Sequence, residues 1–304
     1  MAEAEFWEVG NGAGASHSRS IEDIEIGPDG TIWLGGSFNA IVPNTGSGIP
    51  ISISDGSMIE PFVQINGIDS GTTEGFVRDV VPDGLGGWYI GGAFQYIDST
   101  SHGRLAHILS DGTLDSDFNP SPDGIVYALY LSGTTLYVGG EFTNIGGEVR
   151  NRLAAINTTT NTVTAWNPNA DNAIYTIAEG GGDIYIGGDF TTIGGTTRNR
   201  LAAVDGVTGA LEAWDPNASA RVNVIDIDGG VVYVGGQFTT INGATTRNRI
   251  AALDPTVGTA SIWNPNASAE VFTLDADSAN VYAGGTFTTI GGSSRNRIAA
   301  PNTT

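Results

Sequence analysis

The stretch from Ala173 to Ala218, AIYTIAEGGGDIYIGGDFTTIGGTTRNRLAAVDGVTGALEAWDPNA, decides the fold. Its residues up to Glu179 alternate apolar and polar side chains, as a half-buried strand does, and the following GGGD predicts a tight hairpin turn. Three further strands are expected at Ile184–Ile193, Arg200–Asp205 and Leu211–Trp214. Proline follows the last strand, where its missing N–H costs no ladder hydrogen bond. The stretch therefore predicts four short strands separated by turns.

This stretch is one copy of an internal repeat. Two glycines, one variable residue and a phenylalanine recur six times, starting at Gly35, Gly91, Gly139, Gly187, Gly235 and Gly284. The intervals are 56, 48, 48, 48 and 49 residues, and four-stranded units of that length are typical of β-propeller blades. We therefore expect residues 1–304 to form a single all-β domain, a six-bladed β-propeller of four-stranded blades. Glycine pairs inside strands indicate close approach of another backbone, here of the neighbouring blade.

The ends of the chain predict how this propeller closes. The last repeat has a third strand at Arg297–Ala300 and then stops without a fourth strand. Residues Glu5–Val9 resemble the missing strand, since Trp7 matches Trp214 of the complete repeat. Because an open blade would leave an unpaired edge, we expect the N-terminal strand to complete the sixth blade. The alternative is a frayed N-terminus beside an open last blade.

Composition excludes several classes of protein. The chain has 33 acidic and 12 basic residues, a formal charge of −21, and no cysteine. Every basic residue is arginine. The lack of cysteine and lysine excludes a disulfide scaffold, a cysteine-ligated metal protein, a thiol enzyme and a lysine Schiff-base enzyme. The negative charge predicts no binding to nucleic acid, and without a long apolar run we expect no transmembrane segment and no membrane insertion.

The same features bear on location. The N-terminus has neither a basic region nor an apolar core, so we expect no signal peptide in this chain,. The protein is then assembled inside a cell or has lost a signal. An acidic, lysine-free surface also suits a halophilic protein from a saline habitat, although acidic surfaces occur elsewhere.

Two sequence patterns resemble known propeller repeats. The segments Tyr137–Gly140, Ala155–Asn157 and Trp166–Pro168 resemble a kelch repeat, and Asp111–Pro120, DGTLDSDFNP, is similar to the delta-sixty repeat. The resemblance covers all six repeats and is weakest in residues 1–75. It implies a β-propeller with a binding or structural role, as in large microbial surface proteins and some virus particles. It implies no catalytic residues.

An Arg-Asn-Arg triplet lies between the expected second and third strands of four repeats. The copies are Arg150–Arg152, Arg198–Arg200, Arg247–Arg249 and Arg295–Arg297. They should share one face of the propeller with the proline-containing turns after the fourth strands, and the opposite turns carry acidic and no basic residues. Guanidinium forks suit carboxylate and phosphate, so the triplets could form an anion- or glycan-facing ring. Alternatively, each arginine hydrogen-bonds a neighbouring turn carbonyl and joins blade to blade.

A specific binding site is expected where the repeat is broken most. Long turns after Trp7 and between Phe62 and Phe76 flank the first blade on the arginine-bearing face. Long loops on a rigid scaffold commonly carry function, although drift in surface turns, or a lock around the chain junction, explains them as well. The candidate binding residues of this sector are His17, Arg19, Asn66, Asp69, His102 and Arg104.

Paired aspartates suggest one candidate metal site. The pairs occupy equivalent places in the fifth and sixth repeats: Asp226, Asp228, Asp275 and Asp277. Alternate residues of a strand point to one side, so adjacent blades could gather four carboxylates around Ca²⁺. Ordinary acidic hairpin turns explain the same residues. We expect no other cofactor.

These observations favour a protein that is not an enzyme. Three histidines without cysteine or lysine offer little nucleophile or base chemistry,. We expect a structural or attachment module that presents its loop face to a partner, on a virion surface or tail. Its partners would be other structural proteins of the assembly or a host-surface glycan or protein, with homo-oligomers in the assembly. The alternatives are a propeller fragment of a large secreted surface adhesin and a carbohydrate-active hydrolase or lyase with channel carboxylates.

Overall fold

The computed structural model describes residues 21–26, 31–36, 48–52, 54, 60–66 and 76–303. All regular structure in these residues is β-structure, as predicted. They contain no helix long and apolar enough to cross a membrane. Contacts divide the chain into two compact units. The first unit is Met1–Leu136, Phe142–Val149 and Ile156–Val163, and the second is Tyr137–Glu141, Arg150–Ala155 and Thr164–Thr304.

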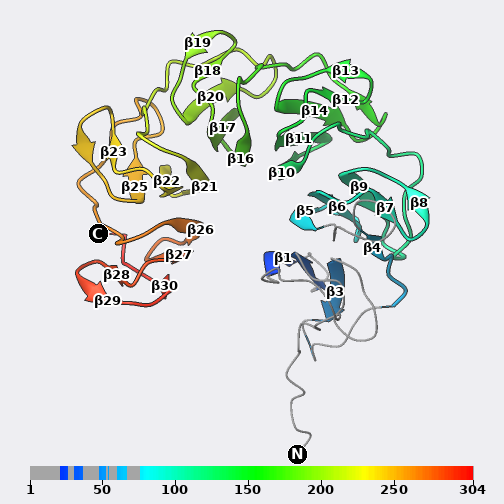
Figure 1. Cartoon of the computed structure of the whole chain (residues 1–304), viewed down its shortest axis with the longest axis horizontal. Helices are drawn as coiled ribbons and strands as arrows, with labels where there is room; N and C mark the ends of the chain where they lie inside the picture. The colour runs from blue at the N-terminus through cyan, green and yellow to red at the C-terminus, as the bar shows by residue number, and fades with distance from the viewer. Residues whose placement is uncertain are drawn as a thin grey trace, which may run out of the picture. The chain divides into compact units, whose positions relative to one another are not determined.

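Each repeat builds one main sheet, numbered here 1 to 6 in chain order (Figure 1). Sheets 1 and 2 are β1 (Ile21–Ile26), β2 (Thr31–Gly36) and β3 (Gly48–Ser52), then β5 (Val77–Pro82), β6 (Trp88–Gly92) and β9 (Leu105–Ile108). Sheet 3 is β10 (Val126–Ser132), β11 (Thr135–Gly140), β14 (Leu153–Asn157) and β15 (Thr162–Val163). Sheets 4 and 5 are β16 (Ile174–Gly180), β17 (Asp183–Gly188) and β20 (Leu201–Asp205), then β21 (Val222–Asp228), β22 (Val231–Gly236) and β25 (Ile250–Leu253). Sheet 6 is β26 (Val271–Ala276), β27 (Val281–Gly285) and β30 (Ile298–Ala299).

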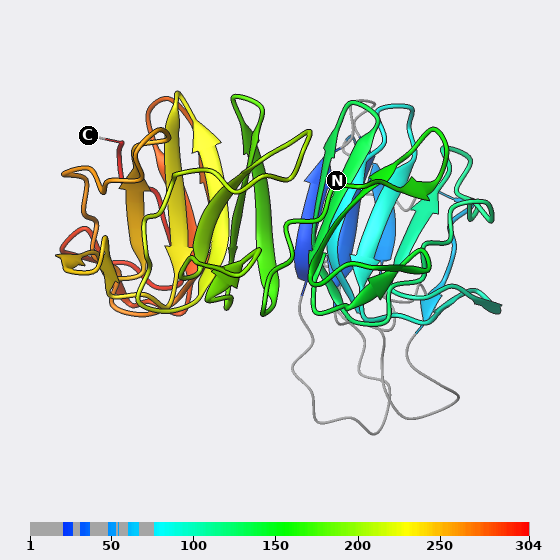
Figure 2. The same ribbon diagram turned by 90° about the horizontal axis from the view of Figure 1, so that it is seen from above.

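Small sheets of two-residue strands accompany five of the main sheets. They are β4 (Ile65–Asn66), β7 (Tyr96–Ile97) and β8 (Thr100–Ser101); β12 (Asn144–Ile145) and β13 (Glu148–Val149); β18 (Thr192–Ile193) and β19 (Thr196–Thr197); β23 (Thr240–Ile241) and β24 (Thr245–Thr246); and β28 (Thr289–Ile290) and β29 (Ser293–Ser294). In side view, turns and hairpins lie at both ends of the long strands (Figure 2).

The prediction of one continuous strand at Ile184–Ile193 is wrong, because the chain leaves the ladder at Gly188. β17 ends there, and Thr192–Ile193 pairs instead with β19. A Cβ on Gly188 would lie 2.1 Å from the carbonyl oxygen of Ala173, so only glycine fits where the chain bends over the start of β16. The bend turns Phe190 into the core, where its side chain is fully buried.

The fourth strands are also shorter than predicted. In sheet 4 the expected strand Leu211–Trp214 is reduced to one bridge between Val204 and Leu211, and sheet 5 has the equivalent bridge. Beyond that bridge the chain turns toward the next sheet, where the Trp214 indole N–H donates to the carbonyl of Asp254 at 2.9 Å.

Close packing explains why the glycine pair and the phenylalanine recur at the same spacing in every repeat. A Cβ on Gly187 of β17 would lie 2.8 Å from Cγ1 of Val222 on β21, and one on Gly235 would lie 2.7 Å from Cγ1 of Val271. The first glycine of the motif therefore lets side chains of the neighbouring sheet approach. The predicted close approach of a backbone occurs instead at the second glycine, where the carbonyl of Ala173 belongs to the same repeat as Gly188. The motif's last residue is fully buried in the five repeats where it is described: Phe94, Phe142, Phe190, Phe238 and Phe287.

Candidate functional site

The arginine triplets hold the turns of their own repeat. The Arg198 guanidinium donates to the carbonyl of Glu212 at 2.9 Å, and the Asn199 amide donates to Oδ1 of Asn217 at 3.0 Å. The equivalent bonds recur as Arg150 to Thr164, Arg247 to Ser261, Asn151 to Asn169 and Asn248 to Asn266. The expected bonds to turn carbonyls are therefore present, and these bonds of Arg150, Arg198 and Arg247 stay within one repeat.

Aromatic pairs join successive repeats of the second unit, beside an ion pair between Arg221 and Asp189. The Tyr185 hydroxyl donates to the carbonyl of Pro255 at 2.9 Å, beside the bond from Trp214 to Asp254. The two rings meet edge to face with centroids 5.0 Å apart, a favoured aromatic geometry. The same pairing recurs between Tyr137 and Trp166 and between Tyr233 and Trp263.

The structure describes only part of the candidate binding set. His17, Arg19 and Asp69 lie outside the described residues. Asn66 ends β4, where its backbone pairs with Tyr96. The structure does not show these four residues together, and their role in binding stays a prediction.

The other two candidate binding residues make contacts inside the fold. His102 is only 2% exposed. Burial lowers the pKa of its imidazole, and the nearby Phe118 backbone acts to raise it by a smaller amount. Arg104 donates to the carbonyl of Pro122 at 2.9 Å from a backbone with a φ of 64°. The Arg104 contact holds two turns together in the way the arginine triplets do.

The candidate metal residues serve different purposes. Asp226 accepts the backbone N–H groups of Ile227 and Ala276, at 2.9 and 2.6 Å. Burial raises its pKa, although these two bonds act against the shift. Asp277 caps a turn by accepting the N–H groups of Ala279 and Asn280. Among the described residues, the acidic group close enough to share an ion is a different one, Asp183, Asp205 and Glu212.

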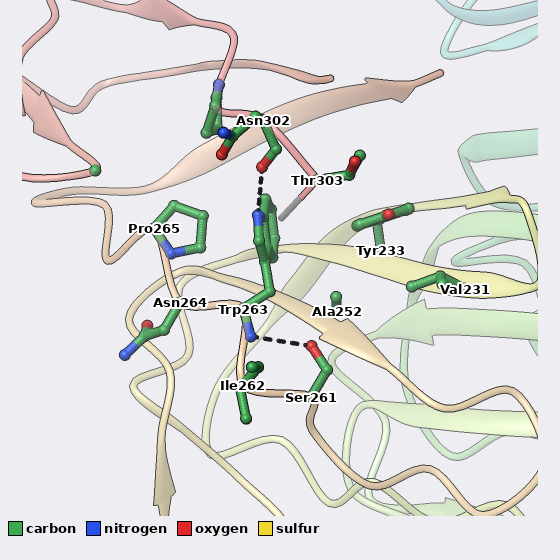
Figure 3. A pocket seen from close by; sticks show the side chains of 12 residues that line it. Val231, Tyr233, Ala252, Ser261, Ile262, Trp263, Asn264, Pro265, Asn302 and Thr303 are labelled. Carbon is green, nitrogen blue, oxygen red and sulfur yellow. Dashed lines mark hydrogen bonds between the residues drawn. The ribbon is translucent and has the colours of Figure 1, made fainter. Parts of the chain in front are cut away.

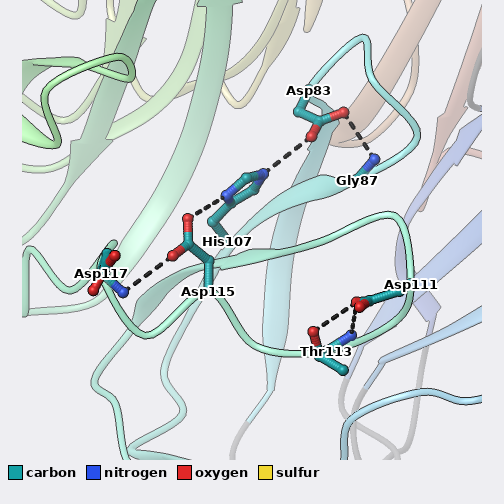
Figure 4. Close-up of polar contacts among 7 residues, drawn as sticks. All are labelled: Asp83, Gly87, His107, Asp111, Thr113, Asp115 and Asp117. Carbon is teal, nitrogen blue, oxygen red and sulfur yellow. Dashed lines mark hydrogen bonds and ion pairs between the residues drawn. The ribbon is translucent and has the colours of Figure 1, made fainter.

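A histidine held between two carboxylates was not anticipated from the sequence (Figure 4). His107 on β9 contacts Oδ2 of Asp115 through Nδ1 at 2.9 Å and Oδ2 of Asp83 through Nε2 at 3.1 Å. Its ring stacks on Tyr89 with centroids 4.3 Å apart. The signal for this cluster was a histidine at the strand position where the fourth repeat has Ala203, with aspartates in the turns on either side. Since both ring nitrogens are occupied, the imidazole is fixed in place.

Two pockets lie along the aromatic pairs of the second unit. One, of about 680 Å³, is lined by Tyr233, Trp263 and Pro265 together with Asn302, whose carbonyl accepts the indole N–H (Figure 3). The other, of about 590 Å³, is lined by Tyr185 and Trp214 and by the carboxylate-bearing residues Asp183 and Glu212. Pockets with aromatic walls and a few polar groups are the usual form of a ligand site. Sequence reasoning missed both, because each is formed by parts of two successive repeats.

One family matches the chain, described as "Domain of unknown function (DUF5122) beta-propeller". The match covers residues 86–118, 135–159 and 182–202, each of which contains the glycine–phenylalanine motif. It supports a β-propeller and does not confirm the kelch or delta-sixty resemblance. The search of curated proteins found no match.

Solved propeller structures share the fold. The Neurospora crassa Pan2 WD40 domain has a TM-score of 0.58 at 13% identity, over 89% of this chain and 74% of that one. The computationally designed Ika8 protein has a TM-score of 0.53 at 13% identity, over 94% and 85%. The extracellular domain of a protein assigned as a hybrid two-component system of B. thetaiotaomicron has a TM-score of 0.56 at 16% identity, over 94% of this chain and 33% of that one. Identities this low show a β-propeller fold and nothing about function.

Proposed function

We propose that this chain is a non-enzymatic β-propeller module that presents its loops to a partner, as a surface or tail component of a virus particle acting in assembly or host-surface binding. The observation that supports it is how the described histidines are held. His102 is buried, and both ring nitrogens of His107 face carboxylates. A general base needs a free nitrogen within reach of a substrate proton, and neither side chain offers one.

The surface we propose for the partner is the sector with the long loops. Arg19, Asp69, His17 and Asn66 belong to it by sequence, and long loops on a rigid scaffold can diverge without disturbing the sheets. Several weak contacts repeated over the copies of an assembly would supply the affinity. Arg104 would act through the loop that it holds, since its guanidinium bonds Pro122.

We also propose that the six repeats close into one ring, with residues 5–9 completing sheet 6. Support comes from two residues of that sheet. Tyr282 is 42% exposed, whereas Tyr233, its equivalent in sheet 5, is 5% exposed. Ile298 is 72% exposed, and its equivalent Ile250 is fully buried. An exposed apolar face of this kind ordinarily has a partner. The N-terminal segment contains Trp7, which matches the tryptophan of the complete repeats.

A second candidate is a propeller cut from a large secreted surface adhesin. The observation that favours it is the fold shared with an extracellular domain about three times as long as the matched region. Both candidates place the protein outside a cell or on a particle. Co-sedimentation separates them, because a virion component fractionates with particles and an adhesin fragment with the cell envelope.

The experiment on the loop sector compares two variants. Arg19→Ala/Asp69→Ala should leave the melting temperature unchanged and weaken binding to particles or envelopes at least tenfold. The control Arg295→Ala/Asp117→Ala removes the same residue types from exposed positions outside the sector and should bind normally. Unchanged binding of the first variant would contradict the site. Polysaccharide cleavage that disappears on changing one carboxylate would contradict the non-enzymatic role.

A further inference from the structure

The pocket beside Trp214 carries acidic groups that its counterpart in the next repeat does not. Asp183 begins β17, where Val231 begins β22. Glu212 precedes Trp214 by two residues, where Ser261 precedes Trp263. The tyrosine–tryptophan walls are otherwise the same. Of these two equivalent pockets, the one beside Trp214 therefore carries two carboxylates that the other lacks.

We propose that this acidic pocket binds a cationic side chain, lysine or arginine, of a partner protein. The pocket is lined by turns that carry no arginine, and none of its lining residues belongs to the candidate binding set, so the proposal does not depend on the proposed function. Its volume of about 590 Å³ accommodates one long side chain,.

The carboxylates are close together and lack a cation of their own. Asp183 lies opposite Asp205 in the ladder of β17 and β20, and the oxygens of these two and of Glu212 lie within 4.8 Å of one another. Asp205 is engaged by the turn that follows it, through Val207 and Thr208. Within the described residues, neither the Asp183 nor the Glu212 carboxylate receives a hydrogen bond or an ion pair.

The electrostatics of Asp183 agree with an unpaired acid. Burial raises its pKa, and the negative charge of Asp205 raises it further. A cation placed between these groups would relieve both effects, because it stabilises the charged form that burial and repulsion disfavour.

The walls of the pocket explain why the cation should carry a hydrocarbon stem. Ile227 and Pro255 line it together with the ring of Tyr185. Lysine and arginine lay their methylene groups along apolar surface and keep the charged head among polar groups, and cations are also favoured near aromatic rings. A bare metal ion would use the carboxylates and leave the apolar wall without a contact. A chain of charge −21 also attracts basic partners over a distance,.

The test uses small probes with defined side chains. Nα-acetyl-arginine amide and Nα-acetyl-lysine amide are titrated into ¹⁵N-labelled full-length protein, and the backbone amides of Gly180, Gly181 and Thr256, which line the pocket, are followed by NMR. We expect these amides to shift with millimolar dissociation constants. Nα-acetyl-norleucine amide, which has the lysine stem without its charge, should shift them at least tenfold more weakly.

Variants separate the pocket from the general negative charge. Asp183→Asn/Glu212→Gln keeps shape and removes charge, so it should fold normally and bind the basic probes at least tenfold more weakly. The control Asp117→Asn removes an exposed acid that does not line the pocket and should bind within twofold of the parent. An equal loss in the control, equal binding of the norleucine probe, or the same amides shifting with CaCl₂ at lower concentration than with the basic probes would each overturn the proposal. So would the absence of any shift.

Discussion

Replacing Gly187 with alanine tests whether close sheet packing explains the repeated glycines. The new Cβ would lie 2.7 Å from Cγ2 of Thr176, 2.8 Å from Cγ1 of Val222 and 3.3 Å from Cδ1 of Ile225. Two of these distances are too short for carbon atoms, and the first two atoms belong to β-branched side chains with restricted χ1. Overpacking of this kind costs about 1–3 kcal/mol.

A smaller effect acts in the other direction. Alanine restricts the unfolded chain more than glycine does, which stabilises a protein by about 0.4–1 kcal/mol where no strain arises. We therefore expect a net loss of about 1–2 kcal/mol for Gly187→Ala, from overpacking less this entropy gain. Gly188→Ala should cost more, because its Cβ would meet a backbone oxygen at 2.1 Å and a backbone cannot rotate away.

Gly103→Ala supplies the matched control for the Gly187 variant. Its Cβ would meet only Oγ of Ser121, at 3.8 Å, and its φ is ordinary. Equilibrium unfolding in urea, followed by tryptophan fluorescence, should rank the three variants by stability as Gly103→Ala, Gly187→Ala and Gly188→Ala. A Gly187→Ala protein as stable as Gly103→Ala would refute the packing explanation.

Two further predictions concern charge. Asp171 accepts hydrogen bonds from the Thr191 hydroxyl and from the backbone N–H groups of Thr191 and Thr192. Although burial acts against them, these bonds hold the pKa of Asp171 below its usual value. Ser219 accepts the equivalent two N–H groups in the next repeat. Asp171→Ser should therefore cost less stability than Asp171→Ala, for which we expect a loss of about 1–2 kcal/mol in thermal or urea unfolding. A lowered pKa means that the unfolded chain binds the proton more readily than the folded chain, so the stability that Asp171 contributes is present above about pH 4 and lost as the pH falls below it. The Asp171→Ser variant should therefore lose less stability on acidification than the parent protein does. Equal losses of stability in acid would contradict this. The melting temperature of the parent protein should rise with NaCl up to molar concentrations because salt screens the self-repulsion of a −21 chain,, and a flat or falling curve would argue against a saline-adapted surface.

The strands themselves were largely predictable, because their signal is local. The alternation before Gly180 and the turn that follows it placed β16 and β17 within about one residue of where they begin. The break at Gly188 was not predictable, since its cause is the carbonyl of Ala173, fifteen positions away. The length of the fourth strand was wrongly predicted for a similar reason, because Trp214 leaves the ladder of its own sheet and donates a hydrogen bond to the next repeat.

The site was less predictable than the fold. The sequence marks Asp183 and Glu212 as acidic, but only the register that sets Asp183 opposite Asp205 brings the carboxylates together. His102 shows the opposite error, since a polar residue in an irregular turn is in fact buried. Residue type predicts chemistry, whereas burial and register depend on contacts between distant parts of the chain.

The most direct test of the closed six-repeat ring is the stability of the protein without residues 2–9. If residues 5–9 complete sheet 6 and cover Tyr282 and Ile298, their deletion should cost several kcal/mol, by analogy with other losses of buried contacts, and lower the melting temperature by about 5 °C or more. Deletion of residues 2–4 alone, which leaves the proposed strand intact, should change little. A protein without residues 2–9 that remains monomeric and melts within a degree or two of the full chain would contradict closure by the N-terminal strand.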